Sequence, residues 1–127
     1  MKFDIAVIGS GPGGYVAAIR AAQLGKKVAI IEKADLGGVC LNWGCIPTKA
    51  LLKSAQVFDY INHAADYGIT VKDHKADFEG MVKRSRGVAE GMSKGIAFLM
   101  KKNKIEVIKG AAKLAGKGKI SVTGDRS

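Results

Sequence analysis

Three short runs of apolar residues along the chain have the length of buried β-strands. They are rich in Val, Ile and Ala, which is typical of strands that are covered on both faces of a parallel sheet. The runs are centred on residues 4–8, 28–32 and 105–109. Residues 15–24, YVAAIRAAQL, separate the first two runs and predict a helix that begins near Pro12. This order predicts an α/β fold with a parallel sheet.

The middle of the chain has the spacing of two long helices. Residues 48–67 predict one helix, and residues 77–102 carry apolar residues at helical spacing with Asp77 as the expected N-cap. Residues 110–124 alternate weakly between apolar and polar positions and predict a small hairpin or meander. Three glycines in the second helix repeat every four residues and fit either a close packing surface or a mobile helix: Gly87, Gly91 and Gly95.

Composition and charge narrow the possible partners. The 127 residues are 47% hydrophobic, enough for one domain with a modest core. The net charge is +10, but the basic residues are spread out and there is a single Trp, so we expect no nucleic-acid binding. Asp4 interrupts the first apolar run, and no run approaches the roughly 20 residues of a membrane span. We therefore expect a cytoplasmic protein with no membrane partner. In the cytoplasm, thiols stay reduced unless a disulfide has a function.

A glycine-rich segment joins the first strand to the first helix. It fits G-x-G-x-x-G, with Gly9 for a tight turn, Gly11 for close approach to a pyrophosphate and Gly14 for packing of helix on strand. Glu32 ends the second strand, where a carboxylate can accept both hydroxyls of a ribose. The context predicts a dinucleotide-binding site rather than a glycine-rich turn without a ligand.

The two cysteines of the chain, Cys40 and Cys45, have three possible roles. A zinc site would need further ligands, and His63 and His74 are not at ligand spacing, so we expect no metal. These histidines are expected at the surface or at helix ends rather than in catalysis. Burial of two free thiols is possible in general, but the glycines around them form a poor packing segment.

A redox pair explains more of this segment. A disulfide between Cys40 and Cys45 would close only a small ring, so little chain entropy favours the bond and we expect it to remain reducible. Pro47 fits the first turn of the following helix, which puts Cys45 at the helix N-terminus, where the dipole stabilises a thiolate. Lys49 adds positive charge one turn along. We expect Cys45 to be the stabilised thiolate and Cys40, on the preceding loop, to exchange with a substrate.

The runs GGVCLNWGCIPTKALL and IGSGPGGYVAAIRAAQLG resemble the pyridine nucleotide–disulfide oxidoreductases. The resemblance implies a Rossmann-like FAD-binding domain, with FAD as the dinucleotide and NAD as a second cofactor. It places Cys45 against the flavin as a charge-transfer thiolate and Cys40 in attack on the substrate disulfide. It also places Lys49 beside the flavin ring and Glu32 on the adenosine ribose. Further expected FAD contacts are Lys33, Gly37, Gly38, Val39 and, through its backbone, Ala112.

Within the family, CIPTKALL is most similar to the members that oxidise dihydrolipoyl groups. The resemblance then implies a homodimer that serves the lipoyl domains of 2-oxo acid dehydrogenase or glycine cleavage complexes. The alternatives are a glutathione-reductase-like or mercuric-reductase-like enzyme, or a non-catalytic FAD-binding fragment. Trp43 departs from the family pattern, where Val is common, and is interpreted as a packing difference.

Chains of this family are several times longer than this sequence. They carry a second G-x-G-x-x-G for NAD, a later FAD segment, an interface domain and a C-terminal His-Glu pair. We therefore expect residues 1–127 to be the N-terminal segment of a discontinuous FAD-binding domain, with the NAD-binding and dimer-interface domains absent. Alone, this segment is expected to bind FAD poorly and to be inactive.

Overall fold

A computed structural model describes residues 1–124 of the chain. The elements follow one another as β1 (Ile5–Ile8), α1 (Pro12–Gln23), β2 (Val28–Glu32), α2 (Gly38–Asn42), α3 (Cys45–Asn62), the 3₁₀ helix η1 (Ala64–Tyr67), α4 (Phe78–Lys102), β3 (Glu106–Lys109), β4 (Ala111–Leu114) and β5 (Ile120–Thr123). The three predicted strands and the helix near Pro12 are therefore confirmed.

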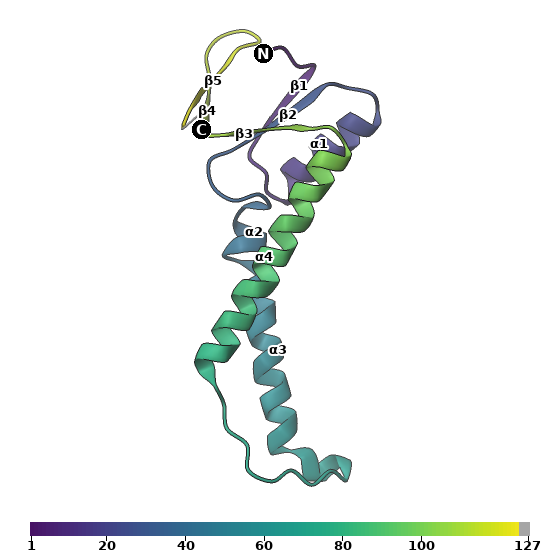
Figure 1. The fold of residues 1–127 in the computed structure, drawn as a ribbon, viewed down its shortest axis with the longest axis vertical. Helices are drawn as coiled ribbons and strands as arrows, with labels where there is room; N and C mark the ends of the chain where they lie inside the picture. Colours follow the sequence, from purple (N-terminus) through teal and green to yellow (C-terminus); the bar gives the residue numbers. More distant parts are fainter. Residues whose placement is uncertain (125–127) are drawn as a thin grey trace.

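The first three strands form a parallel sheet in the order β1-β2-β3. Strand β2 is the middle strand, and its first four residues are buried, as its continuous apolar sequence predicted. The register pairs Ile8 with Ile31 and Glu32 with Lys109, so the carboxyl ends of the strands lie at one edge of the sheet. Helix α1 connects β1 to β2 (Figure 1). The predicted α/β, Rossmann-like fold is confirmed.

One hydrophobic core joins the sheet to its helices. Ile30 of β2 is fully buried, and it packs in one cluster with Ala18 of α1 and Met100 of α4. Leu41 of α2 belongs to the same cluster. The C-terminal half of α4 therefore anchors on the sheet, while its N-terminal half extends away from it beside α3 (Figure 1). The segment that carries the cysteines is fixed to the core through α2.

The long helices follow the predicted pattern with one shifted boundary. The Asp77 carboxylate accepts a hydrogen bond from the Gly80 N–H at 3.0 Å, which confirms the predicted N-cap of α4. The helix predicted over 48–67 begins earlier, at Cys45, and ends at Asn62; its last residues form η1, which Gly68 ends in the left-handed conformation. Helix α4 runs without interruption through Gly87, Gly91 and Gly95. A Cβ added at any of these glycines would meet no atom of the described chain within 4 Å.

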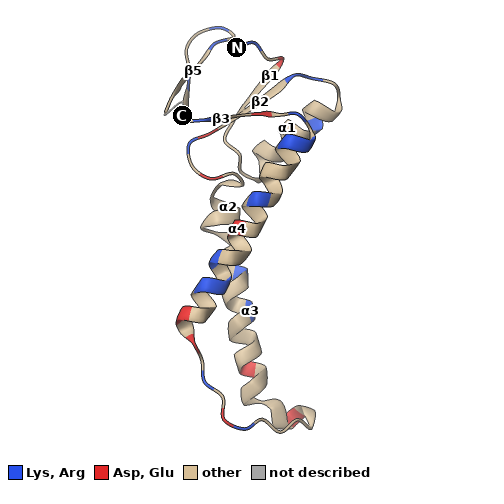
Figure 2. Cartoon of the chain, in the orientation of Figure 1, with Lys and Arg blue, Asp and Glu red and all other residues tan. Residues whose placement is uncertain are grey.

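The C-terminal segment forms the predicted hairpin, in which β4 and β5 pair antiparallel. Lys and Arg are distributed over the helices and the connecting loops (Figure 2). None of the helices within residues 1–124 has the length and apolar character that crossing a membrane requires.

Candidate dinucleotide and disulfide site

The glycine-rich turn after β1 brings two backbone segments into contact. Gly9 has a positive φ of 91°, and its N–H donates to the Ile31 carbonyl at 2.8 Å. A Cβ at Gly14 would collide with the Gly9 carbonyl oxygen and would lie 3.6 Å from the Val7 side chain. Gly9 thus allows the turn, and Gly14 allows α1 to lie directly against the end of β1.

The opposite side of this turn is open. Gly11 is the N-cap of α1 and Pro12 is its first residue, so the N–H groups of Gly13 and Gly14 have no acceptor within the helix. A Cβ built at Gly11 or Gly13 would meet no atom within 4 Å. The first turn of α1 contains no acidic residue. Open space, free N–H groups and the positive end of the helix dipole together fit a pyrophosphate.

The Glu32 carboxylate lies at the end of β2 and is held by the same turn. Its Oε2 accepts hydrogen bonds from the Ser10 backbone N–H at 2.9 Å and from the Ser10 hydroxyl at 2.7 Å. Its Oε1 accepts from the Ala34 N–H at 3.0 Å. Burial opposes ionisation, but the Ser10 hydroxyl and the backbone N–H groups outweigh it and lower the pKa of Glu32. The carboxylate is thus ionised and oriented, as recognition of a ribose requires.

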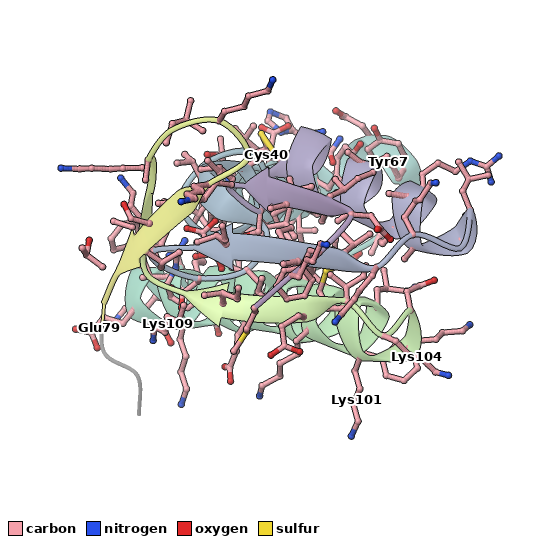
Figure 3. The ribbon with its side chains drawn as sticks, turned by 90° about the horizontal axis from the view of Figure 1, so that it is seen from above. Cys40, Tyr67, Glu79, Lys101, Lys104 and Lys109 are labelled. Atoms are coloured by element: carbon pink, nitrogen blue, oxygen red, sulfur yellow. A yellow bond between two sulfur atoms is a disulfide. The ribbon has the colours of Figure 1, made fainter. Side chains whose placement is uncertain are left out.

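Cys40 and Cys45 form a disulfide, with their Cα atoms 4.7 Å apart (Figure 3). Cys45 is the first residue of the 18-residue α3, so the expected position at a helix N-terminus is observed. Cys40 lies in the short helix α2 and not on a loop, which corrects that prediction. Within the described chain, Cys45 is exposed, while Cys40 is half-buried against the core.

A set of hydrogen bonds fixes the segment that carries Cys40. The Asn42 side-chain amide donates to the carbonyls of Leu36 and Gly38, both at 3.0 Å. Arg86 of α4 donates to the Asn42 carbonyl at 2.9 Å, and Ser93 donates to the Leu36 carbonyl at 2.8 Å. None of these residues was among the predicted site residues. The only sequence signal for Asn42 was its position between the two cysteines, whereas Arg86 and Ser93 bond to residues more than 40 positions away.

Two further contacts join this segment to the glycine turn. Gly37 has a φ of 100°, and its N–H donates to both the carbonyl and the hydroxyl of Ser10, at 3.1 and 3.2 Å. Gly38 also has a positive φ, and a Cβ there would lie 2.8 Å from the Gly11 Cα. Direct backbone contacts therefore hold the segment that carries Cys40 against the glycine turn and Glu32. Ser10, which connects the two, was not among the predicted site residues.

The other predicted cofactor contacts lie around these elements. Lys33 and Val39 are exposed, and Lys49 is exposed one turn along α3 from Cys45. Ala112 is half-buried in β4, just after Gly110, whose N–H donates to the Glu32 carbonyl at 2.9 Å. Ala112 is thus brought to the same edge of the sheet as Glu32.

The histidines lie away from this site, as expected. His63 is the C-cap residue of α3, and His74 bonds to the side chain of Asn62, the last residue of that helix. Both are exposed. Trp43 follows α2, and its backbone N–H donates to the Val39 carbonyl at 2.8 Å. Trp43 is more than half exposed.

Comparison with known proteins agrees with this geometry. Residues 3–126 match the family described as pyridine nucleotide-disulphide oxidoreductase. The dihydrolipoyl dehydrogenase of Rhizobium etli is 57% identical over 95% of this chain and 25% of its own length. That of Chlorobaculum parvum is 53% identical over 98% of this chain and 26% of its own. That of Bacillus subtilis is 47% identical over 100% of this chain and 27% of its own. The chain thus spans about a quarter of these relatives, and it belongs to the pyridine nucleotide-disulphide oxidoreductase family.

Proposed function

We propose that this chain supplies the redox disulfide and part of the FAD site of an enzyme that oxidises protein-bound dihydrolipoyl groups with NAD+. The observation that carries the proposal is the Cys40–Cys45 disulfide, which joins the N-terminus of α3 to a helix in contact with the glycine turn. The relatives named dihydrolipoyl dehydrogenase support the choice of substrate over glutathione or mercuric ion.

The residues present fit FAD. The open first turn of α1 at Gly11 would hold the pyrophosphate, and the Glu32 carboxylate would hold the adenosine ribose. Lys49 would lie beside the flavin, and the Ala112 backbone would contact the adenine. When bound, FAD would accept two electrons from the cysteine pair and pass them to NAD+. Lys33, Gly37, Gly38 and Val39 are proposed to complete the contacts.

The cysteine pair would take two electrons from the substrate by thiol–disulfide exchange. A dihydrolipoyl thiolate attacks the Cys40 sulfur, the bond between the cysteines breaks, and Cys45 leaves as a thiolate. The second dihydrolipoyl thiol releases its proton to solvent and attacks the substrate sulfur joined to Cys40, which closes the lipoyl disulfide and releases the Cys40 thiolate. The substrate is oxidised by two electrons, and the cysteine pair is reduced by two.

The position of the cysteines favours this order. Cys45 lies at the positive end of the α3 dipole with Lys49 one turn away, so a negative charge is more stable on Cys45. A more stable thiolate is the better leaving group. Cys45 is exposed in the described chain, and we propose that the flavin covers it in the loaded protein and leaves Cys40 to the substrate.

The remaining parts of the proposal concern assembly. Residues 1–127 would form the N-terminal segment of a discontinuous FAD-binding domain in a homodimeric enzyme. That enzyme would act in the cytoplasm on lipoyl domains of 2-oxo acid dehydrogenase or glycine cleavage complexes.

The test uses the complete protein expressed from the gene that encodes this chain. We expect it to purify with FAD and to reduce NAD+ when dihydrolipoamide is added. Cys40→Ser and Cys45→Ser should each abolish this turnover but retain FAD. Reduction of glutathione disulfide with NADPH, without activity on dihydrolipoamide, would contradict the proposed substrate. Absence of FAD from a folded preparation would contradict the proposed cofactor.

A further inference from the structure

Ser10 occupies a variable position of the G-x-G-x-x-G pattern, yet its side chain is completely buried and fully used in hydrogen bonding. It has 0% exposure. Its hydroxyl donates to Glu32 Oε2 at 2.7 Å and accepts from the Gly37 N–H at 3.2 Å. It therefore lies between the carboxylate at the end of β2 and the residue that precedes α2.

The two hydrogen bonds fix the direction of the hydroxyl. A serine hydroxyl has one proton to donate, and its oxygen can accept. Because the Gly37 N–H is directed at the oxygen, the hydroxyl proton is directed at Glu32. Hydrogen bonds to a charged acceptor are stronger than those between neutral groups. The hydroxyl therefore restrains the rotation of the carboxylate and does not only fill space.

Glu32 remains partly exposed after these bonds are made. Oε2 accepts both hydrogen bonds from Ser10, and Oε1 accepts one from Ala34, with a smaller contribution to the carboxylate from the Lys33 backbone N–H. A ligand hydroxyl would therefore approach Oε1, the oxygen that does not bond to Ser10. The hydrogen bonds thus fix the Glu32 carboxylate with no ligand present, which would lower the ordering cost of binding.

We propose that Ser10 is a positioning residue that sets the affinity and selectivity of the site for the ribose hydroxyls of the adenosine half of a dinucleotide. This inference rests on the proposed function, because it assumes that FAD is the dinucleotide. Ser10 acts through Glu32 and does not contact the ribose itself.

The experiment compares two ligands in the complete protein expressed from its gene, freed of cofactor. The ligands are FAD and an FAD analogue whose adenosine ribose lacks both hydroxyls, and binding is followed by quenching of flavin fluorescence. Ser10→Ala removes the hydroxyl and keeps the backbone N–H that donates to Glu32. We expect it to bind FAD about tenfold more weakly, the effect of one hydrogen bond to a charged group. Its affinity for the analogue should be unchanged.

Two controls separate positioning from general structure. Ser85→Ala removes an equally buried hydroxyl, which bonds to the Val82 carbonyl within α4, and should leave both affinities unchanged. In a Glu32→Ala background, Ser10→Ala should cause no further loss, because the hydroxyl then has no carboxylate to orient.

The outcomes distinguish the inference from the proposed function. A wild-type protein that does not bind FAD contradicts both. A wild-type protein that binds FAD, with a Ser10→Ala variant that binds it equally well, overturns only the inference. Equal loss of affinity for both ligands, or an unfolded variant in melting curves, also overturns it, since either would show a structural role.

Discussion

Gly14→Ala should destabilise the fold because no space exists for the added methyl group. The Cβ would overlap the Gly9 carbonyl oxygen, a backbone atom that cannot rotate away. Overpacking of this kind costs up to about 3 kcal/mol. Alanine is favoured over glycine inside a helix by about 1 kcal/mol, so the net loss should be about 2 kcal/mol. Urea unfolding of the 127-residue chain, followed by circular dichroism, gives this difference from the midpoint and slope.

The matched control is the same substitution on the open face of α4. A Cβ at Gly91 would meet no atom within 4 Å, and its φ is not in the left-handed region. Gly91→Ala should therefore stabilise the chain by about 0.5–1 kcal/mol. The two substitutions are thus expected to have opposite signs. If Gly14→Ala is as stable as wild type, or more stable, the contact between α1 and the end of β1 is not as close as described.

Three further predictions concern the site. Gly11→Leu should abolish FAD retention in the complete protein, because its side chain would fill the open space; a yellow preparation at normal stoichiometry would refute this. In the reduced, FAD-loaded protein, iodoacetamide should label Cys40 first. Only Cys45→Ser should lose the long-wavelength thiolate–flavin absorbance. If Cys45 is labelled first, the roles of exchanging thiol and charge-transfer thiolate are reversed. Because the pKa of Glu32 is lowered on folding, its stabilisation is present above the ordinary Glu pKa of about 4.3 and is lost as the pH falls through the folded value. Glu32→Gln should therefore flatten the acid limb of the stability curve, and an unchanged limb would contradict this.

The elements that the sequence predicted well are those in which a local pattern and the packed environment agree. Strand β2 is a continuous apolar run and is buried over its first four residues. The N-cap of α4 could be predicted because Asp77 precedes a long segment with apolar residues at helical spacing. The structure shows its carboxylate accepting a hydrogen bond from the Gly80 N–H. The glycine turn was recognised from its position between strand and helix.

The parts that were missed depend on contacts between distant residues. Helix α2 has five residues, too few to show a period, and it is fixed by Asn42 and by Arg86 of α4. The half-buried position of Cys40 depends on its contacts with the core, which the local sequence does not show. Ser10 was missed because the position between the first two glycines carries no fixed residue type in the pattern.

The glycines before Cys40 connect the two halves of the site. Gly38 has a positive φ, and an added Cβ would lie 2.8 Å from the Gly11 Cα, so a side chain here would separate α2 from the glycine turn. Gly37, also left-handed, donates to Ser10, whose hydroxyl in turn holds Glu32. The backbone that carries Cys40 and the backbone that would meet the pyrophosphate are therefore in direct contact. A change in either loop must move the other, so the distance between the dinucleotide site and the disulfide is set by this contact and not by the length of the connecting segment alone.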